Sequence, residues 1–555
     1  MYFPRNPASV EPDYPKLSSL AIVGHMTAKT CRLWVRMYCA ATWWLVVTEK
    51  PLQGDIDTLD GLNVDEFVAK QAANPVFCQA KIITASTDNT AVFNVTGLQA
   101  GRKYYYAVIA DLADADRIPS RTEIGHQRKK FFHALPASLN TMTFGYFSCH
   151  DPFSFDHFNE GAWSLYYQTM VNRNGLFSIG GGDQMYIDTH NTKESMRSVW
   201  DWLGDYKNAI IQAYSENGEL KRQALIQYFA EIYRNYYRMY WNCQNLRKTF
   251  ERFPTYMIWD DHEIMDGWGS YTREERSKLL NRFFQDDDEA TNDQLVQLMF
   301  EAAKQVYFEY QHSHNPKTPV SLKPEDNEAC QWDYSFKMGD HGFYVLDMRG
   351  HHDYERHEQG TALLGAKQMT RVLDWLEAAG KRCKSLFIVS PVPVVHWGAL
   401  VSNFDIGSYK DDLRDEWEHE SNHKERNILL DAVLKCSHEQ GCPVTILSGD
   451  VHSASVYQLE NRDAFPKAKV FNATSSAISR KPAPAKAEML IRSTGKISGY
   501  EGGYATRLYA LSGEHNFLMV NTKLEDGTTS VSVDLYWPAG DDGELTQKRI
   551  KLTGE

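Results

Sequence analysis

Short, unbroken runs of apolar residues recur along this chain, and each run ends on a side chain that can bind a metal or transfer a proton. The six runs are FGYFSCHD (144–151), LFSIGGGDQMY (176–186), TYMIWDDHE (255–263), GFYVLDMR (342–349), SLFIVSPVPVVHW (385–397) and PVTILSGDVH (443–452). Such runs, with helical stretches between them, are typical of strands buried on both faces in an α/β domain. Ligands bind outside the carboxyl ends of strands in these sheets. The sequence therefore predicts that the polar endings form a site.

The chain of 555 residues is longer than a single hydrophobic core usually supports, so we expect more than one domain. Residues 1–135 contain β-rich segments separated by turn residues, which predicts a small all-β sandwich. The stretch VTGLQAGRKYYYAVIAD resembles the late strands of fibronectin type III domains. Residues 136–555 are predicted to form the α/β domain, with a helical insertion at about 195–330 where apolar residues recur at helical spacing.

Composition excludes some classes of protein. A net charge of −13 argues against nonspecific nucleic-acid binding, which needs clustered Lys and Arg. The nine cysteines are scattered without CxxC spacing, a pattern that favours reduced thiols in a reducing compartment. The chain begins without the apolar segment of a signal peptide and has no run of 18 apolar residues. We expect a globular protein that is cytoplasmic, the alternative being an exported protein whose signal peptide was removed before residue 1.

Two of the strand ends carry pairs of potential metal ligands. Asp183 follows a strand and glycines that allow a sharp backbone turn, and Tyr186 comes three residues later. Asp450 and His452 are two residues apart, so both side chains lie on one side of an extended segment. Phenolate suits a hard trivalent ion, and Tyr ligation to iron is known.

Two other strand ends strengthen this interpretation. The WDDHE motif (259–263) supplies three carboxylates and an imidazole, and Cys149 offers a soft thiolate ligand. Any single ending is more often a loop cap or a surface group, and Asp188, Asp266 and Asp151 are interpreted as ordinary turn residues. Four such endings in order, each after a buried strand, favour a metal site.

The order of these motifs resembles the PhoD-like alkaline phosphatases, a branch of the calcineurin-like metallophosphoesterases. The matching motifs in this chain are FSCHD, GGDQMY, WDDHE, LDMR and SGDVH, within residues 144–476. The resemblance implies a four-layer α/β/β/α metallophosphoesterase sandwich, preceded by the β-sandwich domain, with metals at the carboxyl edge of the sheets. It implies that ferric iron (Fe3+) is bound by Cys149, Asp183, Tyr186 and His452. It also implies that Asp183 bridges to a calcium ion (Ca2+), which Asp261 and Asp450 bind as well, with other divalent metals as the alternative.

The implied reaction is hydrolysis of a small phosphate ester by metal-activated water, with monoester or diester preference left open. His262, held by Glu263 or a neighbour, would protonate the leaving alkoxide. The planar fork of Arg349 suits phosphate oxygens, but an equally good interpretation is a structural salt bridge.

Two other classes of function were weighed. The chain would be a partner- or polymer-binding module if its metal site were vestigial, although the presence of His262 and His452 argues against decay. It would be a structural metal protein if the ligands filled every coordination position.

Overall fold

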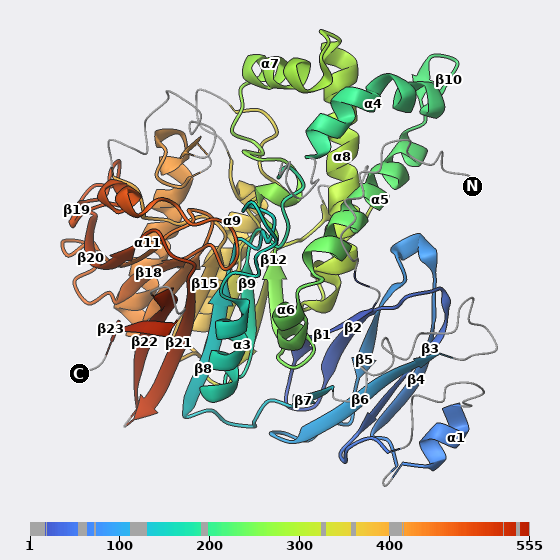
Figure 1. Cartoon of the computed structure of the whole chain (residues 1–555). Helices are drawn as coiled ribbons and strands as arrows, with labels where there is room; N and C mark the ends of the chain where they lie inside the picture. Colours follow the sequence, from blue (N-terminus) through green and yellow to red (C-terminus); the bar gives the residue numbers. More distant parts are fainter. Residues whose placement is uncertain are drawn as a thin grey trace.

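The computed structural model of the chain describes residues 17, 19–53, 64–71, 74–110, 130–189, 198–323, 329–356, 362–398, 413–414, 416–525, 527–539 and 544–553. Its amino-terminal part is a β-sandwich, at the blue end of the colour scale in Figure 1. One antiparallel sheet consists of β1 (Leu20–Met26), β2 (Cys31–Arg36) and β5 (Thr90–Val95). The other consists of β4 (Phe77–Ile83), β3 (Ala41–Thr48), β6 (Lys103–Ala110) and β7 (Phe131–His133), with the short helix α1 (Val64–Ala69) nearby.

Two larger sheets follow in the sequence. The first has the order β12 (Thr255–Ile258), β9 (Ser178–Gly181), β8 (Thr141–Phe147), β21 (Phe517–Glu525), β22 (Thr528–Ala539) and β23 (Glu544–Lys551). The second has the order β13 (Tyr334–Met338), β14 (His341–Val345), β15 (Ser385–Ser390), β16 (Val444–Ser448), β18 (Val470–Ser475), β17 (Ala454–Glu460), β20 (Tyr504–Leu511) and β19 (Gly495–Lys496). The strands β12, β9 and β8 are parallel, as are β14, β15, β16 and β18.

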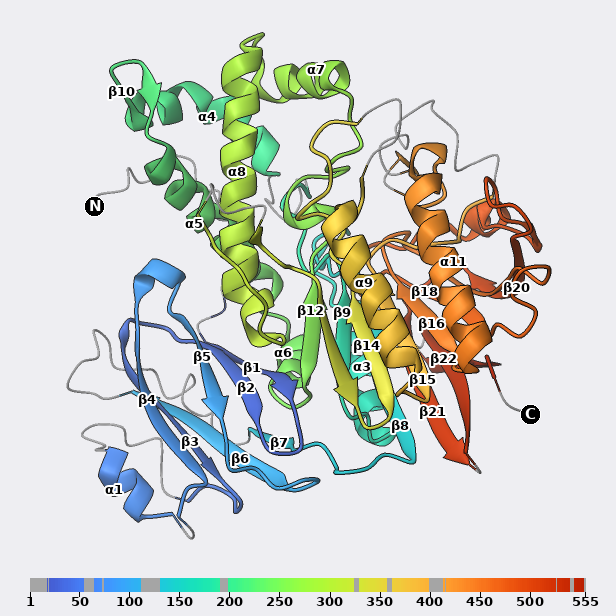
Figure 2. The same cartoon turned by 180° about the vertical axis from the view of Figure 1, so that it is seen from behind.

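The two large sheets pack face to face through aromatic side chains. The ring of Phe144 on β8 lies 5.4 Å from that of Phe343 on β14 and 5.3 Å from that of Phe387 on β15. Helices α3 (Trp163–Asn172) and α6 (Gln244–Phe250) cover one outer face, and α9 (Gly365–Gly380) and α11 (His423–Gln440) cover the other (Figures 1 and 2). Every residue of β15 and β16 is buried, because each strand is covered on both faces. The α/β/β/α fold predicted from the sequence is confirmed.

A group of helices stands at the edge where the parallel strands end (Figure 1). It comprises α4 (Val199–Tyr214), α5 (Arg222–Tyr240), α7 (Arg273–Phe284) and α8 (Glu289–Tyr310), with a small hairpin of β10 (Ser215–Glu216) and β11 (Glu219–Leu220). A capping box starts α7, since the Thr272 hydroxyl and the Glu275 carboxylate each bond to the other residue's backbone N–H. The sandwich packs against α8, where Trp34 Nε1 donates to the carbonyl of Glu309 at 2.6 Å.

All nine cysteines carry free thiols. Among the helices that the structure describes, none combines the length and the apolar character needed to cross a membrane.

Candidate metal centre

The loops that follow β8, β9, β12 and β16 meet at the carboxyl ends of these strands. Cys149 N–H donates to the carbonyl of Gly182 at 3.3 Å, which ties the loop after β8 to the loop after β9. On the other side, a Cβ added to Gly449 would lie only 2.3 Å from Ser148 Oγ, so the loop after β16 passes against the loop after β8 because residue 449 has no side chain. The fold therefore brings together groups from distant parts of the sequence: Cys149 Sγ lies 3.6 Å from the main-chain carbonyl of Asp450, 301 residues away.

Four of the six predicted metal ligands have an unusual backbone conformation. The φ angles are 56° at Cys149, 53° at Asp183, 67° at Asp450 and 50° at His452. Residues other than glycine rarely adopt positive φ, which costs about 1–3 kcal/mol at each position. Strain of this kind concentrates at functional sites, where the surrounding fold holds it in place.

A cluster of carboxylates lies at the centre of the converging loops. The residues Asp183, Asp260, Asp261 and Asp450 each place one oxygen within 4.8 Å of the others. In the described part of the chain, Asp183 Oδ1, Asp260 Oδ2 and Asp261 Oδ1 are buried and have no hydrogen-bond donor. Burying such oxygens without a partner is costly, and a cation satisfies them. The cluster thus fits a hard cation that prefers oxygen ligands.

The other predicted ligands surround the same Asp183 carboxylate. Its Oδ2 accepts a hydrogen bond from Tyr186 Oη at 2.9 Å and lies 3.4 Å from Cys149 Sγ. Nε2 of His452 lies 3.2 Å from Tyr186 Oη. Burial raises the pKa of the Cys149 thiol and of the Tyr186 phenol well above their usual values, and nearby carboxylates add to both shifts. A bound cation would deprotonate these groups, and the set of thiolate, phenolate, imidazole and carboxylate fits ferric iron.

His262 lies at the edge of the cluster and is oriented by Asp188, not by Glu263. Its Nδ1 bonds to Asp188 Oδ1 at 2.8 Å, and Asp188 Oδ2 accepts from the backbone of Asp266 at 2.9 Å. The Glu263 alternative was wrong, because that carboxylate accepts from the backbone N–H groups of Gln184 and Asp260 at 2.7 and 2.9 Å. Burial lowers the pKa of His262, but Asp188 and Asp261 outweigh burial and raise this pKa well above its usual value.

Arg349 forms a buried ion pair beneath the cluster. Its Nε donates to Asp260 Oδ1 at 2.5 Å and one terminal nitrogen donates to the carbonyl of Trp268 at 3.1 Å. The side chain is only 2% exposed. These contacts are those of the structural salt bridge considered from the sequence, while a direct contact between Arg349 and phosphate stays a prediction.

Sequence reasoning missed a carboxylate from the segment before α11. Glu416 is buried, its Oε1 accepts from Trp397 Nε1 at 3.2 Å, and its Oε2 has no hydrogen-bond partner among the described residues. Burial and the neighbouring charge of Asp450 raise the pKa of Glu416 well above its usual value. No strand precedes Glu416 directly, so the rule that identified the other residues passes over it.

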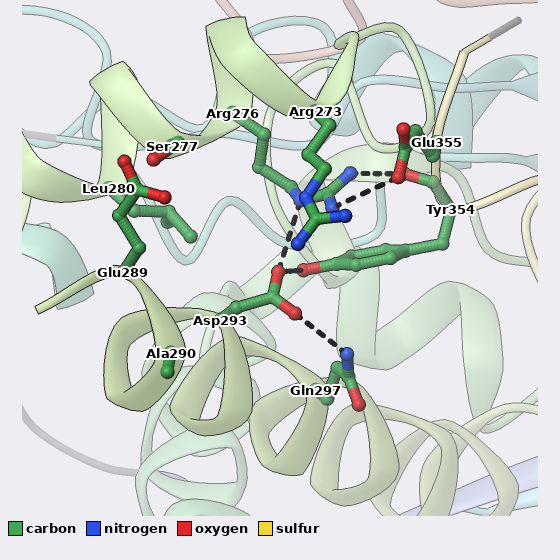
Figure 3. Close-up of a pocket in the computed structure, with 10 residues that line it drawn as sticks. All are labelled: Arg273, Arg276, Ser277, Leu280, Glu289, Ala290, Asp293, Gln297, Tyr354 and Glu355. Atoms are coloured by element: carbon green, nitrogen blue, oxygen red, sulfur yellow. Dashed lines mark hydrogen bonds and ion pairs between the residues drawn. The ribbon is translucent and has the colours of Figure 1, made fainter.

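A cavity of about 430 Å³ lies away from these residues, between α7, α8 and the segment after β14 (Figure 3). Its polar groups bond to one another, since Asp293 accepts from Arg276 Nε at 3.2 Å and from Tyr354 Oη at 2.7 Å. None of the predicted metal ligands lines it. The Tyr354 ring packs 5.1 Å from that of Trp268, whose carbonyl accepts from Arg349, so the wall of this cavity contacts residues next to the carboxylate cluster.

Comparisons with known proteins agree with this arrangement. Residues 144–500 match the family model described as PhoD-like phosphatase. The solved structure of PhoD superposes with a TM-score of 0.62 at 15% identity, over 98% of this chain and 93% of that one. The uncharacterized protein YGR266W of Saccharomyces cerevisiae is 26% identical over an alignment 331 residues long, which covers 50% of this chain and 44% of the yeast protein. This chain therefore spans less than half the length of that curated relative.

Proposed function

Because the chain belongs to the PhoD-like phosphatase family, we propose that it hydrolyses phosphate esters with two cations held between its facing sheets. The observation that carries this proposal is the set of buried oxygens on Asp183, Asp260 and Asp261 that no donor satisfies in the described structure. Most buried polar groups in folded proteins are paired, so three unpaired oxygens within one group of four carboxylates favour a cation there.

We assign one cation position to the residues around the Asp183 carboxylate. Its ligands would be Cys149, Asp183, Tyr186 and His452, with ferric iron as the proposed ion. Asp183 would contribute to both positions, because its Oδ1 has no hydrogen-bond partner in the described structure and its Oδ2 lies beside Tyr186 and Cys149.

The second cation position would use oxygen ligands alone. The candidates are Asp183, Asp260, Asp261, Asp450 and Glu416. Calcium is the proposed ion, because it takes six to eight oxygen ligands in flexible geometry. When bound, two such cations neutralise phosphate oxygens and lower the pKa of a water so that it attacks phosphorus near neutral pH.

His262 is the proposed general acid. Its bond from Nδ1 to Asp188 leaves Nε2 free to give a proton to the leaving-group oxygen. The carboxylates of Asp188 and Asp261 raise the pKa of the imidazole, which favours its protonated form, and the exposed Asp266 lies 4.0 Å from Nε2. Arg349, through its bond to Asp260, would fix the loop that carries both Asp261 and His262.

A binding module with a vestigial metal site is the alternative. Such a protein would not need a largely buried imidazole whose orientation is fixed by a neighbouring carboxylate, as that of His262 is by Asp188. The bond between them therefore favours the enzyme.

Hydrolysis of 4-nitrophenyl phosphate and bis(4-nitrophenyl) phosphate tests the proposal. The protein would be assayed as purified, after chelation, and after addition of iron and calcium, separately and together. We expect activity that chelation abolishes and the two ions together restore, and His262→Ala should retain the metals but lose most turnover. Absence of hydrolysis under every loading condition would favour the binding module, and unchanged turnover in His262→Ala would remove that residue from the mechanism.

A further inference from the structure

The segment after β18 contacts two of the loops that carry predicted metal ligands, the loop with Cys149 and the loop with His452. The backbone N–H of Arg480 donates to the carbonyl of Cys149 at 3.0 Å, and that of Ala483 donates to the carbonyl of His452 at 2.9 Å. The backbone between these contacts is therefore fixed to two predicted iron ligands. This attachment places the side chain of Arg480 at the rim of the site.

Contacts with three residues fix the position of the Arg480 guanidinium. Its centre lies 4.6 Å over the ring of Tyr186. One terminal nitrogen donates to Asp151 Oδ2 at 2.5 Å and to Thr189 Oγ1 at 3.2 Å. Asp151 is fully buried and is itself fixed, because its Oδ1 accepts from the backbone of Phe153 at 3.0 Å. Arg480 is thus held in one orientation before any ligand binds.

The remaining donors of this guanidinium make no bond to the described part of the chain. Its side chain is 27% exposed, and its Nε and second terminal nitrogen have no hydrogen-bond partner within the described part of the chain. Arg349 differs, because it is 2% exposed and bonds to Asp260 and Trp268. Arg480 therefore places a positively charged group, already fixed by its contacts, beside the carboxylate cluster. This group still has donors that an anionic ligand can use.

We propose that Arg480 binds a non-bridging oxygen of the substrate phosphate and makes the enzyme prefer phosphate monoesters over diesters. This inference rests on the proposed function. A planar guanidinium edge suits two phosphate oxygens. A monoester carries two negative charges near neutral pH and has three non-bridging oxygens, whereas a diester carries one charge and has two such oxygens. The dianion therefore gains more from a fixed cation beside the metals.

The test compares Arg480→Gln with Lys481→Gln, a variant that removes the same charge from the exposed next residue of the loop. We expect Arg480→Gln to lower kcat/KM for 4-nitrophenyl phosphate by about 10- to 100-fold and that for the bis ester by no more than about threefold. Lys481→Gln should leave both values near wild type. Calorimetry with orthophosphate should show a matching loss of affinity in Arg480→Gln, and Arg480→Lys, which keeps the charge without the fork, should be intermediate.

Metal content separates this role from a merely structural one. Iron and calcium per chain and the visible absorption of the iron-loaded protein should be the same in Arg480→Gln and wild type. Equal losses for both esters, or a loss of iron, would mean that Arg480 only positions Tyr186, and either result would overturn the inference. If Arg480→Gln were active with unchanged ester preference and phosphate affinity, the role of Arg480 would be refuted while the proposed function stood. A wild-type protein inactive on both esters would instead contradict the proposed function.

Discussion

Replacing Asp188 by Asn tests how His262 works. The substitution keeps the size of the side chain and an acceptor oxygen for Nδ1 of His262, which now lies 2.8 Å from Asp188 Oδ1, but removes the charge. Both side chains are largely buried, with exposures of 12% for His262 and 9% for Asp188, so solvent screens little of this interaction. A hydrogen bond to a charged group contributes about 1.5–3 kcal/mol. A neutral hydrogen bond contributes about 0.5–1.5 kcal/mol, so removing the charge alone loses about 1–1.5 kcal/mol in the transition state and lowers kcat by about 5- to 13-fold.

The pH profile gives the same test a second readout. Burial lowers the pKa of His262, and Asp188 is the largest of the influences that raise it. A general acid must be protonated, so activity falls as the pH rises through its pKa. In Asp188→Asn the descending limb should move to lower pH, with KM and metal content unchanged.

The assay is a set of pH–rate profiles for wild type, Asp188→Asn and the control Asp266→Asn. The Asp266 carboxylate is 48% exposed and lies 4.0 Å from Nε2 of His262, so its removal should change kcat by less than about threefold. If Asp188→Asn kept the wild-type kcat and the wild-type descending limb, Asp188 would not control the protonation of His262.

Three further substitutions test the iron ligand Tyr186, the proposed calcium ligand Glu416 and the ion pair beside the cavity. Tyr186→Phe should remove the visible charge-transfer absorption of the iron-loaded protein, and a colourless wild type with stoichiometric ferric iron would exclude phenolate ligation. Glu416→Gln should weaken calcium binding by about 10- to 100-fold in calorimetry of the iron-loaded protein, and an unchanged affinity would place Glu416 outside the site. Arg276→Met leaves Asp293 without its cation beside the cavity of Figure 3, and thermal and urea unfolding should show a stability about 2 kcal/mol lower with iron content unchanged.

The strands were predictable because their apolar runs are buried on both faces. In β15 and β16 no residue needs to be polar, so the runs are continuous and end abruptly where each strand leaves the sheet. The same abrupt endings identified Cys149, Asp183 and Asp450, which the structure brings together between the facing sheets.

The missed residues depend on tertiary contacts that leave no local pattern. Asp188 looks like any turn aspartate in the sequence, and its importance follows from a bond to His262 across 74 positions. Glu416 lies near Asp450, and Arg480 lies over the ring of Tyr186, but neither residue directly follows an apolar strand run in the sequence. The inward direction of Cys149 and Asp183 also depends on positive φ angles, which the sequence does not predict for residues with side chains.

Anomalous diffraction at the iron edge, on crystals grown from active, iron- and calcium-loaded protein, would locate both proposed cations. The account predicts one iron peak within bonding distance of Tyr186 Oη, Cys149 Sγ and the Asp183 carboxylate. A second, calcium-like peak is predicted on the oxygen side, between Asp261 and Asp450. Active crystals without an ordered ion at Asp183, or with iron bound elsewhere, would contradict the account.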